Sequence, residues 1–276
     1  MKTETFAILG GGNMGRALIG GLLRRGVRAG EIAVGESSET ACAALRNDFG
    51  VTTSVDNATA VAKASLVIVA VKPQDVGTAL APLAQTLQRN RAIVLSVAAG
   101  IRTASLEQWC GPGVAVVRAM PNRPALVGAG ATALFAGKHA NEKDRAQAQS
   151  AMNAVGDVVW VGSEDELDVV TALSGSGPAY YFLLTEAIAQ AAVNLGLEPD
   201  AARRLAVGTL YGAGMLAHEG DGDVARLRAE VTSKGGTTEA ALRTLETADF
   251  RGTMARAMQA ATQRSRELAT QFGGNP

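Results

Sequence analysis

Two patterns of hydrophobic and polar residues alternate along the first part of the chain. Almost uninterrupted apolar runs, such as LVIVAV at residues 66–71 and AIVLSV at residues 92–97, are typical of strands buried on both faces of a parallel sheet. Stretches with helical spacing, such as MGRALIGGLLRRG and SSETACAALRNDFG, lie between such runs. The alternation predicts a doubly wound α/β domain. The predicted strands are Phe6–Leu9, Ile32–Val34, Leu66–Val71, Ile93–Val97, Val114–Arg118, Thr132–Phe135 and Val158–Val161.

After Val161 the strand pattern stops and only helical spacing continues. We therefore expect a Rossmann-type α/β domain at residues 1–162 and an all-helical domain at residues 163–276. The helices predicted for the second domain are Glu164–Leu173, Pro178–Leu195, Pro199–His218, Asp223–Val231, Thr237–Leu245 and Phe250–Leu268.

The most apolar of these helical stretches, Pro178–Leu197, is long enough to raise the question of a membrane span. Glu186, Gln190 and Asn194 recur every four residues along it and form a polar stripe. A buried helix of a soluble protein explains this pattern better. The N-terminal residues also lack the apolar run of a signal peptide, so we expect a cytoplasmic protein without a membrane partner.

A glycine-rich turn, GGGNMG at residues 10–15, follows the first predicted strand and opens the first helix. Gly10, Gly12 and Gly15 fit the pattern G-x-G-x-x-G, in which the glycines allow a tight turn, close approach of a pyrophosphate, and close helix–strand packing. The helix start adds partial positive charge. This context favours dinucleotide binding over a purely structural turn.

The segment after the second strand, GESSE, bears on which dinucleotide is bound. An acid at this point commonly accepts a hydrogen bond from a ribose 2′-hydroxyl, and Glu36 could play that role for NAD. Ser37 and Ser38 could instead donate to the 2′-phosphate of NADP. No arginine follows the strand before Arg46, so both cofactors stay open.

Three further segments lie at the carboxyl ends of predicted strands, where ligands bind in open α/β sheets. They are AVKPQ at residues 70–74, SVAAGI at residues 96–101 and AMPN at residues 119–122. Lys72 could reach a cofactor ribose or a substrate, or it is a solvated loop lysine. Two prolines stiffen the loop around Asn122.

The helical half has two notable turns. SGSGPAY, at residues 174–180, either contacts a cofactor or simply joins two helices. VTSKGGTTEAAL, at residues 231–242, places Gly235 and Gly236 before a helix that Thr237 and Thr238 open. Free N–H groups at a helix start bind carboxylates, although one of these threonines could instead serve only as an N-cap.

The composition of the chain limits the partners, bound metals and catalytic groups that we expect. The 276 residues include 26 basic and 26 acidic ones, a balance that does not suggest a nucleic-acid partner. Cys42, Cys110, His139 and His218 are scattered, so we expect neither disulfides nor a bound metal. No lysine lies between Lys143 and Lys234, which leaves the helical half without the lysine base that a hydroxy-acid dehydrogenase needs.

The chain resembles the pyrroline-5-carboxylate reductases over nearly its whole length. The resemblance rests on ordered segments: ILGGGNMGRALIGGL, AVKPQ, SVAAGI, RAMPNRPALVGAG, SGSGPAY and VTSKGGTTEAALRTLE. It implies reduction of pyrroline-5-carboxylate to proline by NADPH or NADH, the last step of proline biosynthesis. It also implies a helical dimerisation domain, an active site shared between two subunits, and dimers that can assemble further into decamers.

The resemblance also implies site residues. The family's substrate carboxylate lies at the turn that is here Gly236, Thr237 and Thr238, with the Thr238 hydroxyl near the pyrroline nitrogen as the candidate catalytic group. Ser233 and Gly235 complete the candidate substrate site. The family's cofactor contacts fall on Asn57, Ala70, Lys72 and Ala98. The full set of candidate cofactor-binding residues is Gly10, Gly12, Asn13, Met14, Gly15, Glu36, Ser37, Asn57, Ala70, Val71, Lys72, Pro73, Ala98 and Asn122.

Two other functions remain open from the sequence. One is a 3-hydroxy-acid dehydrogenase with the same two-domain plan, against which the missing lysine counts. The other is a nicotinamide-binding sensor or scaffold without turnover.

Overall fold

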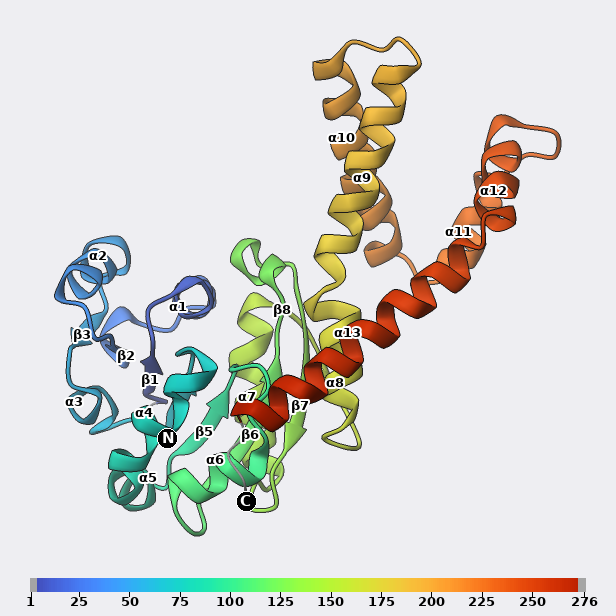
Figure 1. Ribbon diagram of the computed structural model, residues 1–276. Helices are drawn as coiled ribbons and strands as arrows, with labels where there is room; N and C mark the ends of the chain where they lie inside the picture. The colour runs from blue at the N-terminus through green and yellow to red at the C-terminus, as the bar shows by residue number, and fades with distance from the viewer. Residues whose placement is uncertain (1–3, 273–276) are drawn as a thin grey trace. The chain divides into compact units, whose positions relative to one another are not determined.

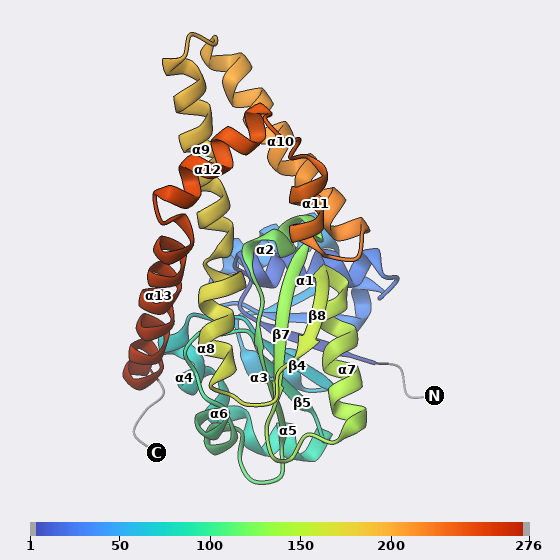
Figure 2. The ribbon, with the colours of Figure 1, turned by 90° about the vertical axis from the view of Figure 1, so that its right-hand side faces the viewer.

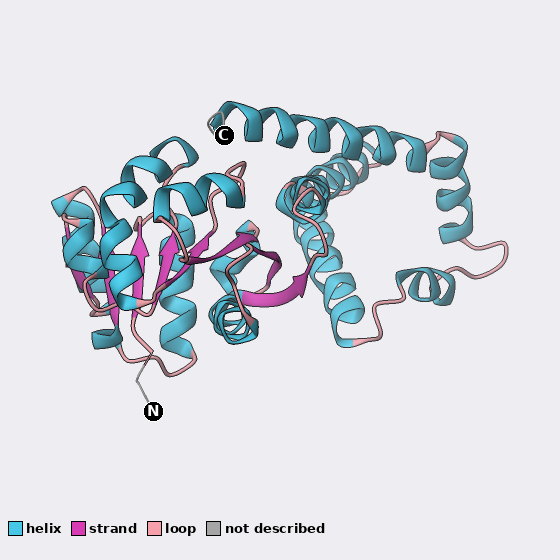
Figure 3. Ribbon diagram, turned by 90° about the horizontal axis from the view of Figure 1, so that it is seen from below, coloured by secondary structure: helices cyan, strands magenta, loops and turns pink. Residues whose placement is uncertain are grey.

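The computed structural model describes residues 4–272 of the chain. They form two compact units, one of residues up to 176 together with those from 261 onward, and one of residues 177–260. All eight strands of the described chain lie in the first unit, and the second is helical (Figures 1 and 3).

A single eight-stranded sheet forms the centre of the first unit, in the order β3-β2-β1-β4-β5-β6-β7-β8. Its pairs are parallel except for β6 with β7. The order reverses beside β1, which makes the space above β1 and β4 the place where ligands bind in doubly wound sheets. The strands are β1 Phe6–Leu9, β2 Ile32–Gly35, β3 Thr52–Ser54, β4 Leu66–Val69, β5 Ile93–Ser96, β6 Ala115–Met120, β7 Gly130–Ala136 and β8 Gly156–Trp160.

Helices cover both faces of this sheet because successive strand side chains point to opposite sides. In β1, Phe6 and Ile8 join the hydrophobic cluster under α1 and α7, whereas Ala7 and Leu9 join the cluster under α4 and α6. Figure 2 shows α7 beside β8 on the first of these faces. The helices of the first unit are α1 Asn13–Arg24, α2 Glu39–Phe49, α3 Asn57–Val61, α4 Val76–Leu80, α5 Ala84–Asn90, α6 Thr103–Cys110, α7 Glu142–Met152 and α8 Glu166–Val170.

The predicted doubly wound domain is confirmed, and β4 and β5 are buried along their whole lengths. The sequence pattern missed β3, and it did not give the antiparallel direction of β7. The predicted helix Glu164–Leu173 is shorter in the structure: α8 ends at Val170, and a π-helical turn continues through Thr171–Gly175.

A buried polar network joins the carboxyl-end side of the sheet to the start of α6. The Arg118 guanidinium on β6 lies 3.0 Å from the Glu164 carboxylate, and only 3% of the Arg118 side chain is exposed. Glu164 also accepts hydrogen bonds from the Thr103 N–H at 2.7 Å and the Thr103 hydroxyl at 2.9 Å. A buried arginine needs such a partner, because an unpaired buried charge is strongly destabilising.

The second unit contains helices at the positions that the spacing predicted. Its elements are α9 Gly177–Asn194, α10 Pro199–Glu219, α11 Val224–Glu230, α12 Thr237–Thr247 and the first part of α13 Phe250–Phe272. Helices α9 and α10 pack against each other (Figure 1).

The part of α13 from residue 261 onward belongs to the first unit, where Ala269 is buried and Phe272 packs on the core. The predicted boundary at Gly162 lies just after β8, whereas the compact units separate after Ser176, because α8 packs against β7 of the sheet. The boundary of the functional domains stays a prediction.

Candidate functional site

The glycine turn after β1 is so tight at Gly10 and Gly15 that only glycine fits at these two positions. A Cβ on Gly15 would lie 2.1 Å from the Gly10 carbonyl oxygen, and one on Gly10 would lie 2.8 Å from the Ala70 carbonyl oxygen. Gly10 also has a φ of +102°, a conformation that favours glycine. Its N–H donates to the Gly35 carbonyl at 2.8 Å, which ties the turn between β1 and α1 to the end of β2.

Gly12 differs from its neighbours because a Cβ there would meet nothing within 4 Å. It is exposed and is the N-cap of α1, which begins at Asn13 and receives no hydrogen bond from a capping side chain. The first N–H groups of a helix have no partner within the helix and carry partial positive charge. The turn therefore offers open space and amide donors to a pyrophosphate, and the residues present fit a dinucleotide.

The start of the segment AVKPQ lies against this turn. The hypothetical Cβ of Gly10 would be 2.9 Å from the Val71 nitrogen, so Ala70 and Val71 line the space beside the glycines. Lys72 is exposed and precedes the 3₁₀ turn that starts at Pro73. The close approach of β1 and β4 thus brings two of the predicted segments together at the point where the strand order reverses.

Glu36, directly after β2, is tied to the glycine turn. Its Oε2 accepts a 2.9 Å hydrogen bond from the N–H of Gly11, while Oε1 accepts from the Ser38 N–H at 3.2 Å and the Ser37 hydroxyl at 3.3 Å. Asn57 lies beside the same strand end, since a Cβ on Gly35 would be 2.2 Å from its Oδ1. The structure therefore gathers Glu36, Ser37 and Asn57 near the glycines.

The sequence analysis did not select two residues of this cluster, Gly11 and Gly35. Gly11 is the variable position inside G-x-G-x-x-G, and Gly35 was counted only as the residue that follows the second strand. The signal for Gly11 was its place in a run of three glycines. The signal for Gly35 was a glycine at a strand end, which marks close approach of another group.

The remaining candidate cofactor residues lie at the ends of β5 and β6. Ala98 is buried, and its N–H points to the Ser96 hydroxyl at 3.4 Å. Asn122 is also buried, and its side chain joins two parts of the unit: Nδ2 donates to the Ser174 carbonyl at 3.0 Å and Oδ1 accepts from the Ala131 N–H at 2.9 Å. The Asn122 side chain thus holds β7 against the turn before α9.

The candidate substrate residues surround the start of α12 in the helical unit. Gly236 is the N-cap of this helix, and no side chain caps it. Gly235 has a φ of +74°, and its N–H donates to Oε2 of Glu239 at 2.7 Å. Glu239 was missed in the sequence, although an acid in the first turn of a helix is a signal for such a back-reaching bond. Thr237 is exposed and Thr238 is half-buried.

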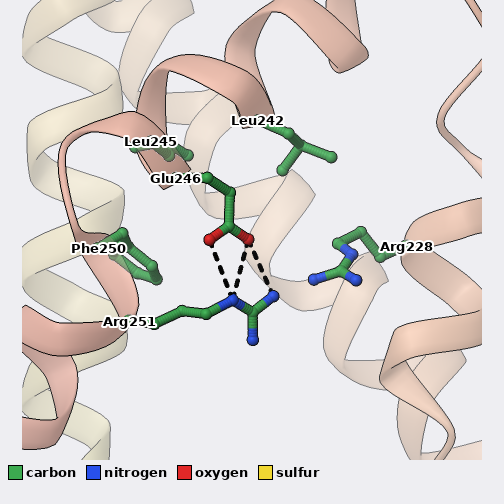
Figure 4. A pocket seen from close by; sticks show the side chains of 6 residues that line it. All are labelled: Arg228, Leu242, Leu245, Glu246, Phe250 and Arg251. Atoms are coloured by element: carbon green, nitrogen blue, oxygen red, sulfur yellow. Dashed lines mark hydrogen bonds and ion pairs between the residues drawn. The ribbon is translucent and has the colours of Figure 1, made fainter.

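The helical unit also contains a pocket between α11, α12 and the start of α13 (Figure 4). Arg251 donates to Glu246 there at 3.0 Å, and this hydrogen bond lowers the pKa of the Glu246 carboxyl. No predicted site residue lines the pocket, whose walls are Arg228, Leu242, Leu245, Glu246, Phe250 and Arg251.

The fold and the glycine cradle define an α/β dinucleotide-binding protein with an added helical unit. Comparison with known families then names it more closely. Residues 164–268 match the family described as pyrroline-5-carboxylate reductase dimerisation, and residues 5–100 match the family described as NADP oxidoreductase, coenzyme F420-dependent.

Full-length relatives agree. The pyrroline-5-carboxylate reductase of Pseudomonas aeruginosa is 42% identical over 99% of this chain and 100% of its own length. The solved structure of the Coxiella burnetii enzyme of that name has a TM-score of 0.93 and 40% identity, and the match covers 97% of this chain and 99% of that one. The structure of the Plasmodium falciparum pyrroline carboxylate reductase, which contains NADP, has a TM-score of 0.83 and 26% identity over 98% and 99% of the two chains. The chain belongs to the pyrroline-5-carboxylate reductase family.

No helix among residues 4–272 is both long and apolar enough to cross a bilayer.

Proposed function

We propose that this protein reduces pyrroline-5-carboxylate to proline with a hydride from NADPH or NADH, the last step of proline biosynthesis. The observation that carries the proposal is a pair of helix starts capped by glycine alone, at Gly12 before α1 and Gly236 before α12. Each leaves amide donors available for an anion. The reaction has two anionic groups to hold, the cofactor pyrophosphate and the substrate carboxylate.

The cofactor role belongs to the first unit. The cradle of Gly10, Gly12 and Gly15 would hold the pyrophosphate, with the N–H groups of Asn13 and Met14 as donors. Glu36, Ser37 and Asn57 would face the adenosine ribose, and the residues from Ala70 to Pro73, with Ala98 and Asn122, would line the path toward the nicotinamide. When bound, the reduced nicotinamide supplies the hydride.

The substrate role belongs to the start of α12. The N–H groups of Thr237 and Thr238 would bind the carboxylate, with Ser233, Gly235 and Gly236 shaping the turn. Glu239 supports this arrangement because its carboxylate is already occupied by the Gly235 N–H. The Thr238 hydroxyl would form a hydrogen bond at the ring nitrogen and orient the imine.

The residue inventory suits this chemistry. The C=N carbon of a protonated imine accepts a hydride without a base to remove an alcohol proton, so the missing lysine between Lys143 and Lys234 is no obstacle. The protein has to orient two rings and hold the carboxylate, and orientation alone supplies several kcal/mol of catalysis.

Self-association fits the helical unit, whose family is named for dimerisation. Helix α9 leaves Tyr181, Phe182 and Leu183 at least 60% exposed in the single chain. Apolar surface of this extent marks an interaction site, and a second copy would cover it.

We further propose an active site shared between subunits, assembly of dimers into decamers, and a cytoplasmic location. We also propose functional domains at residues 1–162 and 163–276, whose boundary is close to the start of the family match at residue 164.

Initial rates of cofactor oxidation test the function. We expect oxidation of NADH or NADPH with pyrroline-5-carboxylate and none with a panel of 3-oxo acids. Reduction of the 3-oxo acids alone would support the dehydrogenase alternative. Tight cofactor binding without any turnover would support a sensor.

A further inference from the structure

The Glu36 carboxylate is held in place by three donors before any ligand arrives. The Gly11 N–H binds one oxygen, and the Ser38 N–H and Ser37 hydroxyl bind the other. The side chain is half-buried at the end of β2, at the turn that cradles the pyrophosphate. The structure therefore presents a fixed negative charge beside the glycine turn.

In a doubly wound sheet, the adenosine ribose of a dinucleotide lies next to this strand end. An ionised carboxylate there accepts hydrogen bonds from the hydroxyls of an unmodified ribose, and such charge-assisted bonds are the stronger kind. A ribose 2′-phosphate brings about −1.5 to −2 charges and only acceptor oxygens, as phosphate monoesters do. The same carboxylate would therefore repel it.

Two of the donors that could compensate for this repulsion already have partners. The Ser37 hydroxyl and the Ser38 N–H both donate to Glu36. The Ser38 hydroxyl caps α2 by accepting the Ala41 N–H at 3.3 Å. Arg46, the first arginine after β2, donates through its guanidinium to the Thr53 hydroxyl at 2.5 Å. These contacts favour NAD over NADP as the dinucleotide that the segment GESSE recognises.

We propose that Glu36 is a specificity-determining residue that makes this enzyme prefer NADH to NADPH. The proposal rests on the proposed function only in taking the glycine turn as a dinucleotide site. It assigns the selection to one carboxylate, held by Gly11, that rejects the 2′-phosphate.

Equilibrium binding of each reduced cofactor, followed by the fluorescence of the bound nicotinamide without any imine present, tests it. The wild-type protein is expected to bind NADH about tenfold or more tightly than NADPH, because hydrogen bonds to a charged group are worth roughly that ratio. Glu36→Gln keeps the volume and an acceptor for Gly11 but removes the charge, and it should lower the preference severalfold, mainly by improving NADPH binding. Glu36→Ser should lower it further.

Glu39→Gln is the matched control, because it removes the same charge from an exposed acidic residue three positions after Glu36. It should leave the NADH-to-NADPH ratio unchanged, and unfolding curves should show that all variants are folded. Equal or tighter binding of NADPH by the wild-type protein would overturn the proposal, as would an unchanged ratio in both Glu36 variants. Because no imine is present, selective NADH binding would stand even if pyrroline-5-carboxylate proved not to be the substrate, and its absence would leave that reaction untouched.

Discussion

The Ser265 hydroxyl on α13 donates a 2.7 Å hydrogen bond to the Asp168 carboxylate on α8, and both side chains are buried. Arg102 stands 3.8 Å from the other Asp168 oxygen. This contact fixes the last part of α13 within the first unit, beside Gly100, whose Cβ position would lie 3.5 Å from the Ala269 nitrogen. A segment near the end of the chain therefore supports the loop that carries the predicted cofactor residue Ala98.

Ser265→Ala should lower the free energy of unfolding by about 1–3 kcal/mol, because one oxygen of a buried carboxylate loses its hydrogen-bond donor. Urea denaturation measures the change. Thr270→Ala, on an exposed position of the same helix, should change it by less than about 0.5 kcal/mol. Equal effects of the two substitutions would show that the buried contact contributes nothing specific.

Gly12→Ala should separate folding from cofactor binding. A Cβ at Gly12 meets no protein atom within 4 Å, and the φ of −70° suits alanine, so the variant should fold as the wild type does. Its methyl group would occupy the space into which the pyrophosphate has to fit, so affinity for both cofactors should fall by about tenfold or more. Fluorescence titration with NADH measures this loss.

Gly30→Ala is the control for that substitution, since Gly30 is exposed and its Cβ position is equally open. It should bind NADH normally. Gly15→Ala should behave differently from both, because its Cβ would lie 2.1 Å from the Gly10 carbonyl oxygen and would damage the turn itself. Normal NADH binding by Gly12→Ala would show that the pyrophosphate does not bind at this turn.

Thr238→Ala should lower kcat by about tenfold or more, as expected for the loss of a hydrogen bond made to the reacting ring. Cofactor affinity should hardly change, because the residue belongs to the substrate turn of α12. Steady-state rates with pyrroline-5-carboxylate, together with NADH binding, measure both quantities. Thr244→Ala, an exposed threonine further along the same helix, should retain wild-type turnover. A fully active Thr238→Ala would end the proposed role of the hydroxyl.

Cys110 should make the protein less stable in alkaline solution. Burial raises the pKa of its thiol from 9.0 to about 12, so the folded state keeps the proton while the unfolded state releases it. The Cys110 thiol does not change the free energy of unfolding below pH 9. As the pH rises from 9 toward 12, it lowers the free energy of unfolding by about 1.4 kcal/mol per pH unit. Cys110→Ala should therefore show a shallower fall of the unfolding free energy between pH 9 and pH 11. Parallel curves for the two proteins would contradict the raised pKa.

The hydrophobic pattern predicted most of the fold because buried parallel strands are continuous apolar runs. It missed β3, which consists of Thr52, Thr53 and Ser54 at the edge of the sheet and carries no apolar residue. The residues of β7 do not indicate its direction, since the apolar pattern of a strand is the same whether it pairs parallel or antiparallel. The short connection at residues 121–129 was the usable signal, because a parallel crossover needs about a dozen residues or more.

For the site, the sequence located segments but not the bonds between them. GESSE allowed either cofactor, and only the position of the Gly11 N–H, 25 residues earlier in the chain, shows what the Glu36 carboxylate faces. Asn122 was taken as a cofactor residue from its place at a strand end, yet its side chain bonds to Ser174 and Ala131. Such long-range partners depend on the folded register, which spacing within one segment does not contain.

The most direct test of the central claim is transfer of deuterium from reduced cofactor that carries deuterium at both hydrogen positions of the nicotinamide ring carbon that donates the hydride. With pyrroline-5-carboxylate, the account predicts one deuterium in each proline formed, on the carbon that was double-bonded to nitrogen, and one cofactor oxidised per proline. Unlabelled proline, or cofactor oxidation without proline, would contradict it.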